Sequence, residues 1–173
     1  MVPPKVAIDS PAIEVMTDLR RIPAASIQSE LTWAQANHAM ILRGVRLLLV
    51  VAENGTVIGT VSAADLLGER PLQLATERQL NRDELTVRDL MVPAESADAI
   101  ELGDVLRSEV GHVVATLQRL GRQHLLVVDS DAAEGPMVRG IFSATQIARQ
   151  LGVAVQTTEI ARTFAQIETA MAG

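Results

Sequence analysis

The chain repeats itself, and this internal duplication constrains the fold more than any other feature of the sequence. G-V-R-L-L-L-V-V-A at 44–52 aligns with G-R-Q-H-L-L-V-V-D at 121–129. I-G-T-V-S-A-A-D at 58–65 aligns with R-G-I-F-S-A-T-Q at 139–146. The second pair is separated by four residues more than the first, and the polar turn at 130–136 is suited to hold them. Two ordered matches at nearly one period predict two copies of one unit.

Each copy is predicted to contain an amphipathic helix. In the second copy, apolar residues recur at helical spacing: Val110, Val113, Val114, Leu117 and Leu120. The first copy shows a looser version of this pattern between Leu31 and Leu42. A glycine follows each segment, at Gly44 and Gly121, and glycine is a common residue at helix ends. We therefore predict two helices that end at these glycines.

Short apolar strands follow each helix. In the first copy, residues 47–52 and 56–61 are predicted strands, and the Asn-Gly pair between them is typical of a hairpin turn. A further short strand is predicted ahead of each helix, at 24–27 in the first copy and at about 98–101 in the second. A short second helix is expected after each hairpin. The predicted order in each copy is strand, helix, strand, strand, helix.

The composition is that of a soluble globular protein and excludes several functions. Hydrophobic residues make up 48% and charged residues 21% of the 173 residues. The formal net charge of −6 argues against a basic face for duplex DNA or for an anionic membrane. The absence of cysteine excludes disulfides and zinc-thiolate sites. Because no apolar run is long enough to span a bilayer and no signal peptide is recognisable, we expect a cytoplasmic protein.

Two segments lie outside the duplicated motifs. Residues 71–85 are rich in charge and are predicted to link the two copies. T-V-R-D-L-M at 86–91 is expected to form a short helix that enters the second copy. The tail at 157–171 is predicted to be an amphipathic helix, whose apolar face consists of Ile160, Phe164, Ile167 and Met171. This face requires cover, either from the protein's own body or from a partner subunit.

The order of these motifs resembles that of the CBS-domain family, in the tandem arrangement known as a Bateman module. The resemblance rests on D-L-M-V-P at 89–93, on the two L-L-V-V strands and on the Gly-hydrophobic-hydrophobic-Ser motif after each hairpin. In the first copy of this motif Thr60 is a loose fit. The resemblance covers about residues 9–155.

Family membership would imply an α/β (α+β) fold of two β-α-β-β-α CBS repeats packed in pseudo-two-fold symmetry, followed by a C-terminal helix. The implied segments are a first repeat at 9–70, a linker at 71–85, a second repeat at 86–155 and a helix at 156–173.

The resemblance also implies a function. In relatives, two clefts between the repeats hold adenine nucleotides or S-adenosylmethionine, sometimes other ligands, and sometimes nothing. Such modules usually pair into flat dimers and regulate another protein without catalysis. Because no catalytic, transporter or channel domain accompanies the repeats, we expect a stand-alone, homodimeric, non-enzymatic sensor of AMP, ADP, ATP or S-adenosylmethionine that acts on a partner protein in trans. The alternative hypothesis is a ligand-free dimerisation or interaction scaffold.

Two interpretations are open for Ser62 and Asp65, at the start of the second helix in the first copy. Their spacing is that of a capping box, in which the serine and the acid each accept a backbone N–H at the helix start. In the family, the equivalent serine approaches a phosphate and the aspartate bonds the ribose hydroxyls. The N–H groups of a helix start favour an anion, and an ionised carboxylate accepts hydrogen bonds from hydroxyl groups.

The second copy has Ser143 at the serine position, but Gln146 replaces the aspartate. A capping box accepts glutamine as well as an acid, so capping alone would make Asp65 and Gln146 nearly equivalent. Ribose recognition would instead make the first cleft the better site. On the ribose hypothesis, we expect Asp65→Ala to weaken ligand binding strongly and Gln146→Ala to weaken it little.

The resemblance implies further ligand contacts from the short strand before the first helix and from the start of the middle strand. In the first copy these candidates, together with the motif residue Thr60, are Pro23, Ala24, Ala25, Arg46 and Leu47. The candidates for the second copy are Pro93, Gln123 and His124. Three arginines are candidates for neutralising phosphate: Arg20, Arg21 and Arg139.

No catalytic residue and no metal site is predicted. The three histidines, His38, His112 and His124, have no matched acid partners in the sequence. The chain lacks the G-x-x-x-x-G-K-[ST] loop of P-loop enzymes and the G-x-S-x-G turn of serine hydrolases. We therefore predict neither an enzyme nor a catalytic cofactor.

Overall fold

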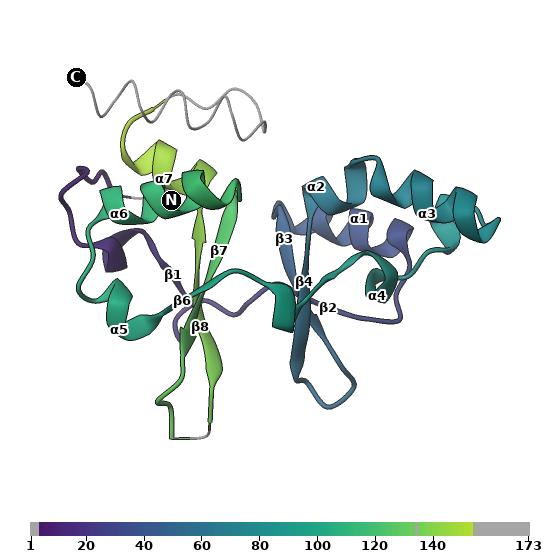
Figure 1. Ribbon diagram of the computed structural model, residues 1–173, viewed down its shortest axis with the longest axis horizontal. Coiled ribbons are helices and arrows are strands. Elements are labelled where there is room, and N and C mark those ends of the chain that lie inside the picture. Colours follow the sequence, from purple (N-terminus) through teal and green to yellow (C-terminus); the bar gives the residue numbers. More distant parts are fainter. Residues whose placement is uncertain (1–3, 134, 154–173) are drawn as a thin grey trace. The chain divides into compact units, whose positions relative to one another are not determined.

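The chain forms two compact units, and the computed structural model describes its residues 4–133 and 135–153. Among these residues, unit 1 combines 4–22 with 98–133 and 135–153, and unit 2 consists of Pro23–Ala97 (Figure 1). Unit 2 therefore holds the first copy of the duplicated motifs, and unit 1 holds the second copy.

Unit 2 contains a four-stranded sheet in the order β2-β3-β4-β5. Its strands are β2 (Ser26–Gln28), β3 (Leu47–Val51), β4 (Val57–Ser62) and β5 (Val92–Pro93). Its helices are α1 (Trp33–Arg43), α2 (Ala63–Leu67), α3 (Arg70–Arg78) and α4 (Val87–Leu90), with 3-10 turns at Arg82–Glu84 (η2) and Ala94–Ser96 (η3). Strand and helix residues share one core, in which Leu48, Val50, Val61, Leu85 and Leu90 are fully buried.

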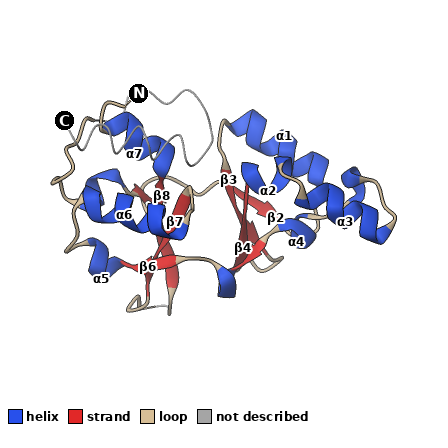
Figure 2. Ribbon diagram, turned by 45° about the horizontal axis from the view of Figure 1, so that its top comes forward, coloured by secondary structure: helices blue, strands red, loops and turns tan. Residues whose placement is uncertain are grey.

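Unit 1 repeats this plan with a sheet in the order β1-β8-β7-β6. Its strands are β1 (Thr17–Asp18), β6 (Ala99–Glu101), β7 (His124–Asp129) and β8 (Met137–Ser143). Its helices are α5 (Leu102–Val105), α6 (Val110–Leu120) and α7 (Ala144–Gln150), with a 3-10 turn at Ala12–Val15 (η1). In each unit the helices lie to one side of the strands (Figure 2). The predicted β-α-β-β-α order and the α/β class are confirmed.

Local sequence patterns explain these elements. Gly44 and Gly121 adopt the left-handed conformation, with φ of 65° and 62°, and end α1 and α6 as predicted. Gly55 in the predicted hairpin turn also has a positive φ, of 83°. Four of the five residues in the predicted stripe of α6 are buried, and Leu120, at its end, is the exposed one.

Each sheet is completed by a strand from the sequence segment that was predicted as the other repeat. Strand β1 lies near the start of segment 9–70, yet it pairs with β8, so that Thr17 stands opposite Ile141. Strand β5 lies near the start of segment 86–155, yet it pairs with β4, so that Val92 stands opposite Thr60. The compact units therefore do not coincide with the continuous segments 9–70 and 86–155 that the sequence suggested.

The glycine of the repeated motif allows these strands to approach closely. A Cβ atom at Gly59 would lie 2.5 Å from the carbonyl oxygen of Val92 and 2.9 Å from the Sδ atom of Met91. A Cβ atom at Gly140 would lie 2.5 Å from the Sδ atom of Met16. In both copies, the motif therefore has a glycine where a side chain would displace the edge strand.

Residues 71–85, predicted as a linker, are part of unit 2. They contribute most of α3, in which Pro71 and Ala75 are buried, and they end at Leu85, which is fully buried in the core. The prediction was wrong because the charged residues of α3 lie on its exposed face, while Pro71, Leu74 and Ala75 pack inward.

The predicted tail helix, with its face of Ile160, Phe164, Ile167 and Met171, lies outside the described residues. Among the residues that are described, no helix has the length and apolar character needed to cross a membrane.

Candidate ligand-binding site

Ser62 and Asp65 form the capping box that their spacing predicts. Ser62 ends β4 and caps α2, and its Oγ accepts a hydrogen bond from the Asp65 backbone N–H at 3.1 Å. The Oδ2 atom of Asp65 accepts a hydrogen bond from the Ser62 backbone N–H at 2.8 Å. Both residues are partly exposed, and within the described residues the Oδ1 atom of Asp65 has no hydrogen-bond partner. One carboxylate oxygen therefore caps the helix and the other remains available.

The second copy keeps only half of this arrangement. Ser143 Oγ accepts a hydrogen bond from the Gln146 backbone N–H at 3.4 Å, but the Gln146 side chain does not bond back to the cap. Its Oε1 instead accepts a hydrogen bond from Thr17 Oγ1 at 3.3 Å, and its Nε2 donates one to Gln150 Oε1 at 3.0 Å. Of the two residues, only Asp65 therefore completes a capping box.

Arg46 lies beside the capping box of unit 2. The Ala63 backbone N–H donates a hydrogen bond to the Arg46 carbonyl oxygen at 2.9 Å, and the next residue, Leu47, pairs with Ser62 in the sheet. The Nε atom of Arg46 is buried without a hydrogen-bond partner. In the described part of the chain, the Arg46 side chain has neither a hydrogen bond nor an ion pair. A buried, unpartnered guanidinium nitrogen is unusual because its desolvation is not compensated.

The equivalent position in unit 1 is Gln123. The Ala144 backbone N–H donates to its carbonyl oxygen at 2.8 Å, so the backbone bond of Arg46 is reproduced. The side chains differ: the first copy combines Arg46 with Asp65, and the second combines Gln123 with Gln146. The site of the first copy therefore carries two charges where the second carries two neutral amides.

The other candidates of the first copy also belong to unit 2. Ala24 and Ala25 are half-buried ahead of β2, and the Ala25 carbonyl oxygen accepts a hydrogen bond from the Leu49 backbone N–H at 2.9 Å. Thr60 is buried in β4, with 9% of its surface exposed. Pro23 is exposed at the first position of the unit. The structure thus brings the strand residues and the capping box into one unit.

The candidates assigned to the second copy are divided between the units. Pro93 lies in unit 2, where it pairs with Gly59, and not with the second copy. Gln123 and His124 lie in unit 1, where His124 pairs with Ser143. The assignment of Pro93 was wrong because β5 joins the sheet of the preceding repeat.

Unit 1 contains an ion pair that the sequence did not reveal. Arg139, a candidate for neutralising phosphate, donates from Nε to Asp18 Oδ1 at 3.1 Å and from a terminal nitrogen to Asp18 Oδ2 at 3.3 Å. The side-chain hydrogen bond from Arg139, followed by the one from the Arg20 backbone N–H, holds the pKa of Asp18 below its ordinary value of 3.8. Arg139 is therefore already paired, whereas Arg20 and Arg21 are exposed.

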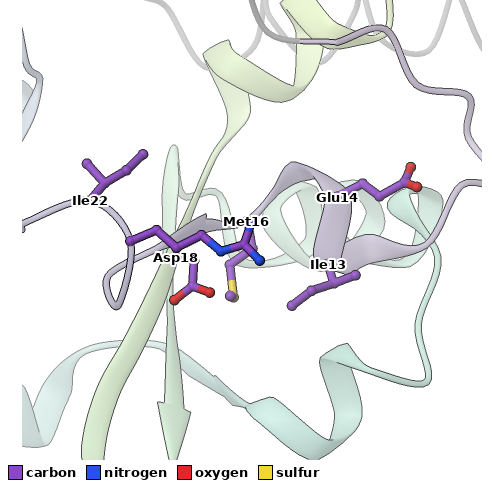
Figure 3. Close-up of a pocket in the computed structure, with 6 residues that line it drawn as sticks. Ile13, Glu14, Met16, Asp18 and Ile22 are labelled. Carbon is purple, nitrogen blue, oxygen red and sulfur yellow. The ribbon is translucent and has the colours of Figure 1, made fainter.

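An open hollow of about 440 Å³ lies next to this ion pair in unit 1. Its lining consists of Ile13, Glu14, Met16, Asp18, Arg21 and Ile22. In Figure 3 the Asp18 carboxylate and the Met16 thioether point to the same side, and Glu14 points away from them. No feature of the sequence predicted this hollow, because its residues belong to a short segment without a repeating pattern.

The fold and the paired motifs define a class of protein. It consists of two β-α-β-β-α repeats in tandem, and the edge strand of each sheet comes from the sequence segment of the other repeat. Residues 12–71 match the family model of the CBS domain. The first copy of the duplicated motifs is therefore similar to the CBS domain. A comparison with curated proteins found no match.

Solved structures of CBS-pair proteins share this fold. CBSX2 in complex with AMP is 22% identical, with a TM-score of 0.57, and the match covers 81% of this chain and 94% of that chain; CBSX2 has also been solved from Arabidopsis thaliana. The CBS domain of the bacterial CNNM/CorC family Mg²⁺ transporter in complex with ATP is 18% identical, with a TM-score of 0.57 and coverage of 84% and 89%. An uncharacterized conserved protein from Pyrococcus horikoshii is 17% identical, with a TM-score of 0.61 and coverage of 88% and 100%.

Proposed function

We propose that this chain is a non-enzymatic regulatory module that binds an adenine nucleotide in unit 2 and signals to a partner protein in trans. The observation that carries the proposal is the Arg46 side chain, whose buried Nε lies beside the capping box without a hydrogen-bond partner in the part of the chain that the structure describes. Two solved proteins of the same fold are complexes with AMP and with ATP, which supports this class of ligand.

The chemistry of the site suits the parts of a nucleotide. An anionic phosphate compensates the desolvated guanidinium of Arg46 through charge-assisted hydrogen bonds. The Ser62 hydroxyl is a second donor beside it. The unbonded Oδ1 of Asp65 accepts hydrogen bonds from ribose hydroxyls, while Oδ2 continues to cap α2. Capping and ligand binding are therefore compatible roles for one carboxylate.

The charge of Arg46 also bears on the choice between nucleotides and S-adenosylmethionine. S-adenosylmethionine offers a guanidinium one carboxylate, but its sulfonium and ammonium make its net charge positive, whereas AMP, ADP and ATP are anions with phosphate groups. We therefore propose a phosphate-bearing adenine nucleotide as the preferred ligand, and S-adenosylmethionine as the weaker one.

Calorimetric titration with AMP, ADP, ATP and S-adenosylmethionine tests the proposal. Arg46→Gln, which places the residue of the second copy in the first, is expected to weaken nucleotide binding about 10- to 100-fold, because hydrogen bonds to charged groups contribute about 1.5–3 kcal/mol. Arg43→Gln removes an exposed arginine at the end of α1 in the same unit and is the matched control. Absence of binding to the wild-type protein, or equal affinity in Arg46→Gln, would contradict the proposal.

A ligand-free interaction scaffold is the second candidate, and three exposed apolar side chains of unit 2 favour it. Ile41 and Leu42 of α1 are 72% and 75% exposed, and Leu67 of α2 is 67% exposed. Apolar side chains exposed to this extent are suited to an interface, and we propose that they contribute to a homodimer. If Leu42→Glu converts a dimer to a monomer in sedimentation experiments while no nucleotide binds the wild-type protein, the scaffold is the better description.

A further inference from the structure

A chain of side-chain amides ties the start of α7 to the N-terminal segment in unit 1. Thr17 in β1 donates to Gln146, and Gln146 donates to Gln150, which is only 2% exposed. Gln150 in turn donates from Nε2 to the Pro4 carbonyl oxygen at 3.1 Å, and its own carbonyl oxygen accepts from the Val6 backbone N–H at 2.8 Å. Both the oxygen and the nitrogen of the Gln146 side-chain amide are therefore hydrogen-bonded within unit 1.

The corresponding positions in unit 2 leave the start of α2 without such a tie. Val92 stands at the position of Thr17, so its side chain has no hydroxyl to donate to Asp65. Glu69, at the position of Gln150, is exposed. The edge segment is held elsewhere, by Arg70, which donates to the carbonyl oxygens of Asp89 and Leu90 at 3.3 Å each.

We propose that unit 1 is locked by the Thr17–Gln146–Gln150 chain and takes no adenine nucleotide, so that each chain binds one nucleotide and only unit 2 responds to it. This inference rests on the proposed function. In unit 1, a ribose would have to displace Thr17 or Gln150 from Gln146, and displacement would leave either the partly buried Thr17 hydroxyl or the buried Gln150 amide oxygen without this partner. In addition, Gln123 supplies no cation at the position of Arg46.

The lock has a structural consequence that does not depend on a ligand. Because Gln150 holds the N-terminal segment and Gln146 holds β1, loss of Gln146 should loosen residues 12–18. The equivalent segment of unit 2, residues 87–93, should be unaffected. Hydrogen exchange of backbone amides measures this difference directly.

The test combines two measurements on the full chain. Titration of the wild-type protein with AMP is expected to give one site per chain. Gln146→Leu and Thr17→Val each break the Thr17–Gln146 bond from one side, and both should raise hydrogen exchange in residues 12–18 at least several-fold, without change in 87–93. Both variants should bind AMP within about twofold of the wild-type affinity.

The outcomes separate the lock from the proposed function. Two AMP sites per chain, or unchanged exchange in both variants, would overturn the lock. Loss of AMP binding in Gln146→Leu, with binding retained in Arg46→Gln, would place the nucleotide in unit 1 and also overturn it. Absence of AMP binding to every variant would refute the proposed function and with it the claim of one site per chain. Hydrogen exchange in residues 12–18 would then still test whether the Thr17–Gln146–Gln150 chain holds β1.

Discussion

Replacing Asp65 by two different residues separates its capping role from its proposed role in binding. Asp65→Ala removes both the hydrogen bond from the Ser62 backbone N–H and the charge in the first turn of α2. Asp65→Asn keeps an oxygen that can accept this hydrogen bond and removes only the charge. The two variants therefore differ in capping but share the loss of the carboxylate.

The expected effects on stability follow from these contacts. A charge in the first turn contributes about 0.3–1 kcal/mol, so Asp65→Asn should lower the free energy of unfolding by that amount. Loss of a capping hydrogen bond costs about 0.5–2 kcal/mol in addition, so Asp65→Ala should be the less stable variant. Binding of AMP should fall about 10- to 100-fold in both, because each loses a charged acceptor for the ribose.

Trp33 supplies the stability assay. It is the only tryptophan of the chain, it is 7% exposed in unit 2, and its Nε1–H donates to the Leu66 carbonyl oxygen in α2 at 2.7 Å. Urea denaturation followed by its fluorescence therefore reports on the unit that contains Asp65, and calorimetry reports on binding. If Asp65→Asn binds AMP as tightly as the wild type, the carboxylate serves only to cap α2 and the assigned ribose contact is refuted.

Two further predictions concern unit 1. Gly140→Ala should lower the free energy of unfolding by about 1–3 kcal/mol, because its Cβ would lie 2.5 Å from Met16 Sδ; an unchanged urea midpoint would be incompatible with this close approach. The hydrogen bond from Arg139 lowers the pKa of Asp18, so the pair stabilises the fold above the ordinary value of 3.8, and this contribution is lost as the pH falls through the lower pKa of the folded state. As the pH falls below about 4, the free energy of unfolding should therefore decrease less in Arg139→Gln than in the wild type. An equal decrease in both proteins on acid denaturation would contradict the role of the ion pair.

Much of the fold was predictable because its signals are local. The stripe of α6 and the hairpin glycine each report on residues that are near one another in the sequence, and the duplication repeats these local signals in a second copy. The capping box of Ser62 and Asp65 was also predictable, since a hydrogen bond between positions three apart depends only on the helix start. The spacing of residues along the chain is enough to specify such contacts.

The candidate site was predictable only in part. The sequence placed Ser62, Asp65 and Arg46 in one copy, and the structure adds that the buried Nε of Arg46 has no hydrogen-bond partner among the described residues. The sequence did not show that the Gln146 side chain bonds to Thr17 instead of to its helix cap, because Thr17 lies 129 residues earlier in the chain. Nor did it show the pairing of Arg139 with Asp18, which are 121 residues apart.

The sequence by itself determined two similar units with their helices and hairpins. It also determined that only the first copy has two charged residues, Arg46 and Asp65, at positions where the second copy has glutamines. The tertiary structure alone decided which edge strand completes each sheet, and thereby which side chains meet at each helix start. The physical reason is that a two-residue strand such as β1 or β5 carries no periodic pattern of its own. Its place is determined by long-range packing, in which the thioethers of Met16 and Met91 lie over the glycines of the opposite repeat.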